Sequence, residues 1–207
     1  MPSKAHEKFI KTIRRCESLV ESYKKLQIIN QEDSVDVPMP KDIIRGAVVL
    51  AVAALDTYVT DVFSEKLVPY LKKFNPTKDL IDLLYASGLD TKEALNLLTM
   101  ERPYRRIRTL IESYYASYTT QKFDVIDKIF KPYSLTQITE NAAKLSGRKS
   151  IKKSVEKLVE RRHQIAHSGD YSSHGRIIEI DEDQIAKRID HLELLVNNID
   201  KILCNRI

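Results

Sequence analysis

The longest apolar run in the chain, residues 46–55 (GAVVLAVAAL), limits the possible folds more than any other segment. The run is about half the ~20 residues that a membrane-spanning helix requires, and the charged residues Arg45 and Asp56 flank it. Its apolar pattern continues as far as Leu67, which is too long for a strand of at most ~10 residues. We therefore predict a core helix over 42–68 in a soluble protein, with no membrane contact.

Amphipathic helices are predicted near both ends of the chain. Apolar residues recur at three- and four-residue steps over 5–29, and charged residues fill the other face. The same period runs to Leu203 after Asp181, which is a good N-cap. A further helix is expected to begin near Ile151 and to end at Gly169, because glycine readily adopts the conformation that closes a helix.

Proline and glycine divide the middle of the chain into shorter pieces. We predict helices over 77–86, 91–99, 104–119, 123–130 and 134–145. Thr91 is the expected N-cap of the second of these, and Ser134 with Gln137 forms a capping-box pattern for the last. Two prolines make 31–40 a loop, and 176–180 (RIIEI) is expected to be extended, as a short strand.

Composition favours an all-α fold in a single domain, 1–207. Five Gly, seven Pro and no Trp in 207 residues are few for the tight turns of an all-β protein. Cys16 and Cys204 belong to no CxxC or Cys/His cluster, so we expect no disulfide framework, no zinc site and a reducing compartment. The sequence has no Walker or GxGxxG pattern, and we expect no cofactor. Residues 1–9 lack the apolar segment of a secretory signal, which favours a cytoplasmic protein.

Positive charge is concentrated in two segments. The whole chain has a net charge of +5, yet between residues 144 and 162 eight basic residues accompany two acids, a local net of +6. A second cluster precedes three tyrosines and consists of Arg102, Arg105, Arg106 and Arg108. Basic residues at this density can follow a phosphate backbone while tyrosines stack on unpaired bases, which fits RNA or single-stranded DNA. The alternative is a solvated helix face with core tyrosines.

The segment 158–170 (LVERRHQIAHSGD) holds an arginine and a histidine with four residues between them, Arg162 and His167. With its Ile-Ala-His and glycine, the segment resembles the RNxIAHG signature of RiboL-PSP-type proteins in the HEPN superfamily, with His163 in place of the usual Asn. The helix over 42–68 resembles that family's other long helix, where an acid such as Asp56 follows an Ala-Leu pair. The resemblance implies an all-α, HEPN-like helical bundle with two long core helices, extra short helices inserted in the middle and a C-terminal amphipathic helix.

The resemblance also implies a metal-independent endoribonuclease that works as a homodimer with a composite active site. Its expected setting is a prokaryotic defence or toxin–antitoxin system with an antitoxin or other partner protein. The chemistry suits the residues: the 2′-OH of RNA attacks the adjacent phosphate, leaving 2′,3′-cyclic phosphate and 5′-OH ends, and needs a base, an acid and a cation. Histidine serves as base or acid near neutral pH, and the arginine fork matches two phosphate oxygens. A HEPN module that binds RNA or a protein without cutting is the alternative.

Each motif residue has an expected role in catalysis and an alternative, purely structural role. We expect Arg162 and His167 to be catalytic, although a surface ion pair and a helix C-terminal histidine are the ordinary roles of such residues. His163 is expected to orient the site, bind phosphate or carry a second proton, or else to replace Asn passively. Asp56 is expected to support the site by pairing with His167 or Arg162, or to lie at the edge of the apolar stripe.

The expected RNA-binding residues are basic and lie on or near the predicted helices: Arg161, Lys157, Lys153, Lys149, Arg105 and Arg106. The alternative to phosphate binding for Arg161 is a solvent-exposed position with no contact to RNA. His163 and His167 also have the i, i+4 spacing of a metal pair, but no HExxH glutamate and no third ligand accompany them. We therefore expect no metal at this site.

Overall fold

The computed structural model describes residues 1–32, 41–116 and 118–207, and it confirms the all-α prediction, because no strand forms in these ranges. Of the expected loop over 31–40, the first two residues belong to a helix and the rest lies outside the described residues. The helices in chain order are α1 (Lys4–Glu32), α2 (Asp42–Lys73), α3 (Lys78–Ala86), α4 (Thr91–Leu97), α5 (Pro103–Tyr115), α6 (Phe123–Phe130), the 3₁₀ turn η1 (Lys131–Tyr133), α7 (Ile138–Leu145), α8 (Ile151–Ser168) and α9 (Glu182–Arg206).

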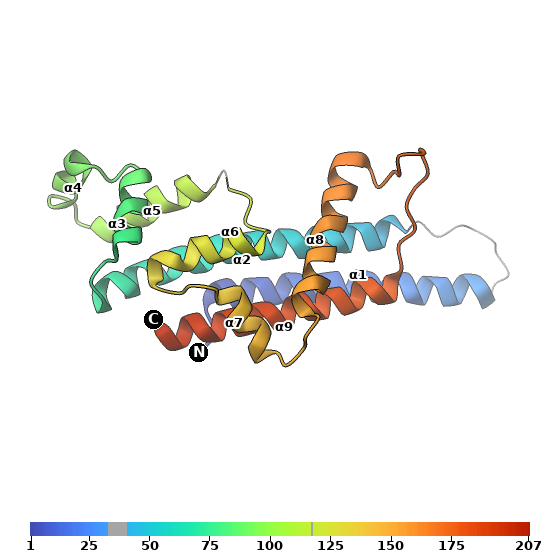
Figure 1. The fold of residues 1–207 in the computed structure, drawn as a ribbon. Coiled ribbons are helices and arrows are strands. Elements are labelled where there is room, and N and C mark those ends of the chain that lie inside the picture. The colour runs from blue at the N-terminus through green and yellow to red at the C-terminus, as the bar shows by residue number, and fades with distance from the viewer. Residues whose placement is uncertain (33–40, 117) are drawn as a thin grey trace.

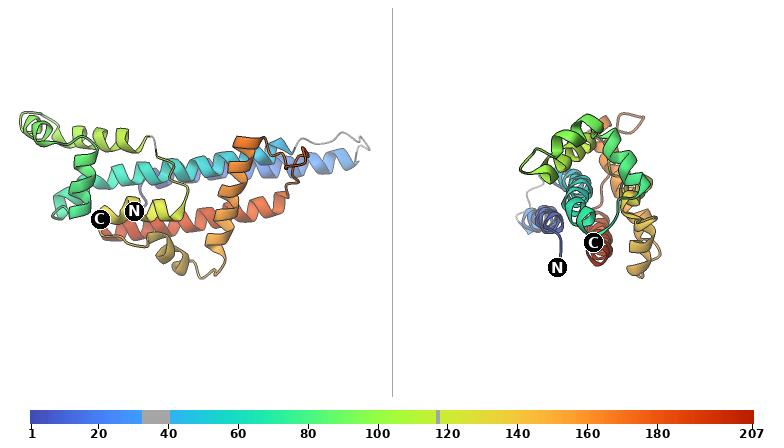
Figure 2. Two further views of the ribbon diagram at one scale, coloured as in Figure 1. Left: turned by 45° about the horizontal axis from the view of Figure 1, so that its top comes forward. Right: turned by 90° about the vertical axis from the view of Figure 1, so that its left-hand side faces the viewer.

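Three long helices, α1, α2 and α9, lie side by side along the length of the molecule (Figures 1 and 2). α2 is the central one, since α1, α5, α6, α8 and α9 all pack against it. Its middle is apolar on every side, and Val48, Val52 and Leu55 are completely buried. By length and composition α2 would suffice to cross a membrane. However, 56% of its 18-residue apolar stretch is buried inside the protein, as in a core helix.

The two ends of the chain meet at one end of this three-helix layer (Figure 1). The backbone N–H and hydroxyl of Ser3 both donate to the carboxylate of Asp200 in α9, at 3.1 and 2.5 Å. The Tyr58 hydroxyl of α2 donates to the same carboxylate at 3.3 Å, so the buried side chain of Asp200 links α9 to α2 and to the residue that precedes α1. Burial and this carboxylate both raise the pKa of Tyr58.

The helix that carries the Arg/His motif, α8, runs across the long helices rather than along them (Figures 1 and 2). Ile151, Val155 and Leu158 are buried and attach it to α2 and α9. The predicted end at Gly169 is confirmed: this residue has φ +59° and closes the helix. In the same view α3, α4 and α5 lie toward the opposite end of the molecule.

Several predicted boundaries are corrected by the structure. Thr91 is the first residue of α4 and not its N-cap, because the side chain of Asp90 accepts the N–H of Glu93 at 2.7 Å. The capping box at Ser134 does not form, since α7 begins four residues later, where Asp127 of α6 accepts the N–H of Thr139 at 2.9 Å. The segment 176–180 forms no strand, and one isolated bridge joins Tyr171 to Ile177 in this loop. The N-cap at Asp181 is confirmed.

Candidate active site

Arg162 occupies a core-facing position of α8. It follows Leu158 by four residues, so it lies on the face that Ile151, Val155 and Leu158 bury, where another apolar residue would continue the stripe. Its Nε is buried and, within the described residues, has no hydrogen-bond partner. A guanidinium here is held by the helix and keeps donors free, which is what binding an oxyanion requires.

The two histidines lie one turn apart on the exposed side of the same helix. The ring centroids of His163 and His167 are 4.3 Å apart, so their imidazoles are in contact. Both line a cleft of about 900 Å³ between α8 and the segment 119–124, and Arg162 lines it as well. The structure thus brings together Arg162, His163 and His167, the three residues that the sequence analysis predicts to be catalytic. They place one guanidinium and two adjacent imidazoles at the same cleft.

The charges around this cleft nearly cancel. Its permanent cations are Lys122 and Arg162, and its carboxylates are those of Asp124, Glu156 and Glu160. With both histidines neutral, two positive charges face three negative ones, a net of −1; with both protonated the net is +1. The other charged groups of the cleft thus do not favour a phosphate, and its attraction depends on Arg162 and the two imidazoles.

Asp56 supports the cleft in a different way from the one expected. Its Oδ1 accepts the backbone N–H of Thr120 at 2.7 Å and also the hydroxyl of Thr120, and its Oδ2 accepts the side-chain N–H of Gln121 at 3.2 Å. In the described part of the chain it makes no ion pair with Arg162 or His167, so the predicted pairing is wrong. The carboxylate instead ties α2 to the segment that forms the wall opposite α8.

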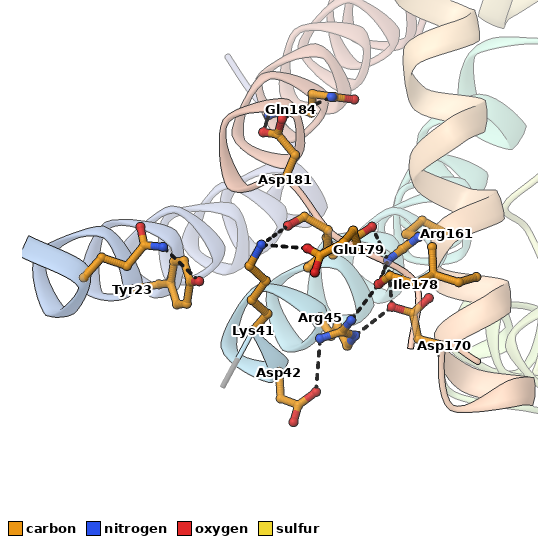
Figure 3. A network of polar contacts seen from close by, with 12 residues as sticks. Tyr23, Lys41, Asp42, Arg45, Arg161, Asp170, Ile178, Glu179, Asp181 and Gln184 are labelled. Atoms are coloured by element: carbon orange, nitrogen blue, oxygen red, sulfur yellow. Dashed lines mark hydrogen bonds and ion pairs between the residues drawn. The ribbon is translucent and has the colours of Figure 1, made fainter. Parts of the chain in front are cut away.

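Arg161 is also reassigned by the structure (Figure 3). Its side chain is only 11% exposed, and its Nη2 donates to Asp170 at 2.7 Å and to the carbonyl oxygen of Ile178 at 2.9 Å. Arg45 at the start of α2 donates to the same two residues, at 2.7 and 2.8 Å. Burial lowers the pKa of the Arg161 guanidinium, and the Asp170 carboxylate opposes that effect. Arg161 therefore fixes α8 to α2 and to the loop after Gly169, and it does not present its charge to RNA.

The remaining basic residues are exposed but do not line the cleft. Lys153 and Lys157 lie on the solvent side of α8, and Lys149 lies in the turn before it. Lys157 precedes His163 by six residues, which places it roughly 9 Å along the axis and about a third of a turn around the helix. Arg105 and Arg106 are exposed at the start of α5, toward the other end of the molecule, where Arg106 pairs with Glu93 at 2.5 Å.

Sequence reasoning missed the wall of the cleft opposite α8. Gln121, Lys122 and Asp124 belong to a segment about forty residues before the motif, and their composition gives no sign of a site. The signal that was available is Asp56, an acid in an apolar helix that needs a buried partner. Within the described ranges, no three His, Cys, Asp or Glu side chains are grouped so that they could hold a metal ion.

A bundle of long helices with an Arg/His pair at the end of a crossing helix is the arrangement of a HEPN-type domain. The family model described as RiboL-PSP-HEPN matches residues 11–205, and the chain belongs to this family. Membership indicates a nuclease-like or RNA-binding module. Neither a curated protein nor a solved structure matches the chain.

Proposed function

We propose that this protein is a metal-independent endoribonuclease that cuts single-stranded or loop RNA. The observation that carries the proposal is the placement of Arg162, His163 and His167 at one cleft. Arg162 neutralises the phosphate and its developing charge, because its donors are free and its position is fixed by the helix. One neutral imidazole takes the proton of the 2′-OH, and one protonated imidazole gives a proton to the leaving 5′ oxygen.

A dimer is part of this proposal. A single His167 cannot act as base and as acid in the same step, and a second copy of the cleft brings a second His167. A second copy facing the first doubles the number of arginines and histidines around one RNA strand. If each cut needs both copies, mixing wild-type protein with an excess of the inactive His167→Ala variant and allowing exchange lowers activity as the square of the wild-type fraction. A linear decrease would show that one copy suffices.

The cleavage test uses purified protein, mixed-sequence RNA and EDTA. Wild-type protein is expected to leave 2′,3′-cyclic phosphate and 5′-OH ends, and His167→Ala to lose at least ~100-fold in rate, the usual contribution of a general acid or base. His174→Ala is a matched control, since His174 is exposed in the loop after α8 and lies outside the cleft. Activity that EDTA abolishes and a divalent ion restores would refute the metal-independent mechanism.

A non-cutting module that binds RNA or a protein is the second candidate, and the carboxylates of the cleft favour it. Asp124, Glu156 and Glu160 suit a basic protein surface better than a phosphate. In that case RNA remains intact in the assay above, and a dimer binds RNA or a partner without change.

A role as a toxin or defence effector, restrained by an antitoxin or other partner protein in the cytoplasm, completes the proposal. It rests on the family to which the chain belongs. Expression in a bacterial host should slow growth, and His167→Ala should relieve the effect at equal protein level. Equal growth with both proteins would contradict a toxic activity.

A further inference from the structure

A second cavity, of about 470 Å³, lies between α2 and the end of α5, and neither His163 nor His167 lines it. Arg162 lines both spaces, so a nucleotide whose phosphate lies at this arginine has the second cavity within reach. Hydroxyl groups are the commonest polar lining here and come from Thr57, Thr60, Ser64, Tyr115 and Tyr118. Its size lies within the range of small-molecule sites in proteins.

Two of these hydroxyls belong to side chains that are nearly buried as a whole. Ser64 is 2% exposed and Tyr115 is 5% exposed, and both line the cavity. Neither side chain makes a hydrogen bond within the parts of the chain that the structure describes. Burial raises the pKa of Tyr115, so its phenol remains protonated and able to donate. Both hydroxyl oxygens reach the open cavity, so they are available to a ligand with donors and acceptors of its own.

The charge of the cavity disfavours an anionic ligand. Three carboxylates line it, those of Asp56, Asp61 and Glu112, against the single guanidinium of Arg162. A phosphate group would be repelled, whereas a neutral base would not. Asp61 and Glu112 have side chains 41% and 48% exposed, each with one basic partner, and so retain oxygens that can accept further hydrogen bonds. Carboxylates only accept, so the ligand that fits must present N–H groups.

We infer that this cavity binds an unpaired nucleobase with an exocyclic amino group, adjacent to the phosphate that Arg162 holds. Adenine, cytosine and guanine have such an amino group, and uracil lacks one. Tyr118 is 44% exposed beside the cavity and offers a ring for the base to stack on. Because the inference names the substrate preference of the proposed ribonuclease, it rests on the proposed function.

The cleavage experiment maps the cut positions in mixed-sequence RNA. We expect wild-type protein to cut next to adenine, cytosine or guanine about tenfold or more in preference to uracil. Tyr115→Phe and Ser64→Ala each remove one unpaired hydroxyl and should narrow this preference by about three- to tenfold, the usual effect of one hydrogen bond. Tyr85→Phe, at a hydroxyl on a 71% exposed side chain of α3, should leave it unchanged. Thermal unfolding of each variant verifies that the fold is intact.

A binding experiment separates this inference from the proposed function. Adenosine, cytidine and uridine are titrated into the His167→Ala dimer, whose second cavity is unaltered, and binding is followed by NMR. Tighter binding of adenosine and cytidine than of uridine, weakened by Tyr115→Phe, supports the base site even if no RNA is cut. Cleavage without base preference, or with the same preference in all variants, overturns the base site and leaves the ribonuclease standing. Equal or absent binding of all three nucleosides also overturns it.

Discussion

At the scale of single residues, burial sets the chemistry of the two thiols apart. Cys16 of α1 is completely buried, and burial raises the pKa of its thiol to about 11. Cys204 of α9 is half-buried, and the ammonium of Lys66 lies 3.2 Å from its sulfur. Because the thiolate is the reactive form, the apolar surrounding protects Cys16, whereas Cys204 is partly accessible to a reagent.

We therefore expect iodoacetamide to modify one thiol in the native protein and two after unfolding in urea. Intact-mass measurement counts the modified thiols, and peptide mapping identifies Cys204 as the first. Modification of Cys16 in the native protein at a similar rate would show that α1 opens far more readily than its packing indicates.

His191 of α9 makes stability depend on pH. It is 4% exposed, and its Nδ1 is buried without a hydrogen-bond partner among the described residues. Burial lowers its pKa most, Arg148 and Lys187 lower it further, and Asp190 partly opposes them. The neutral form is thus the one that fits the fold, and its full contribution is present above the unfolded pKa of ~6.5 and is lost as pH falls below it.

Urea unfolding at pH 7.5 and at pH 5 tests this behaviour. The wild-type midpoint should fall more between the two pH values than that of His191→Leu, which cannot be protonated. His174→Leu, at an exposed histidine, should follow the wild type. A midpoint that falls equally in wild type and His191→Leu would place the acid sensitivity elsewhere.

At the scale of helices and loops, Asp170 is the group on which the position of α8 depends (Figure 3). Its side chain is fully buried and pairs with both Arg45 and Arg161. Its φ of +64° is one that Asn also tolerates. Asp170→Asn therefore removes the charge while keeping the shape and the backbone.

We expect Asp170→Asn to lower the free energy of unfolding by about 3 kcal/mol, since it leaves the nearly buried guanidinium of Arg161 without a counter-charge and Arg45 with only the exposed Asp42. Asp42→Asn is the matched control, because Asp42 also pairs with Arg45 but its side chain is 82% exposed. That change should cost at most ~0.5 kcal/mol. Urea titration monitored by circular dichroism measures both, and equal losses would contradict the central role of Asp170.

The helices themselves were predictable from sequence because a repeating apolar face records which side is buried. The long helices α1, α2 and α9 and the end of α8 at Gly169 follow this pattern closely. The start of α7 does not follow it, because the N–H and the hydroxyl of Thr139 both donate to Asp127, a residue of α6. Local cap patterns cannot anticipate a partner brought in by tertiary packing.

The same distinction holds within the candidate site. Arg162, His163 and His167 share one helix, so their spacing alone predicts that they lie close together. The partners of Asp56 come from residues 64 and 65 positions away, and Arg161 finds its carboxylate only once the loop after Gly169 folds back. These contacts depend on the path of the chain, which the motif does not contain.

At the scale of the whole molecule, the exposed lysines of α8 determine how RNA would approach. Lys153 and Lys157 lie one turn apart on its solvent side. Replacing both with Gln should weaken RNA binding and lower the slope of log affinity against log salt by about 1.4, since each phosphate contact on single-stranded nucleic acid contributes ~0.7. Fluorescence anisotropy with a labelled oligonucleotide measures the slope.

Lys78→Gln with Lys92→Gln changes the net charge equally, at exposed positions of α3 and α4 toward the other end of the molecule. The slope should then stay as in the wild type. If both double variants lower it alike, RNA responds to the overall charge of the protein and not to a track along α8.

Arg161 and Arg162 are neighbours in the chain, yet one anchors α8 and the other faces both cavities. Adjacent residues of a helix point about 100° apart, so the direction of Arg162 follows from that of Arg161. Turning α8 about its axis to withdraw Arg162 would break the contacts of Arg161 with Asp170 and Ile178. Covering the cleft leaves these contacts intact, whereas rotating α8 breaks them. We therefore expect a regulator to inhibit this protein by occluding the cleft, which costs less energy than turning the helix.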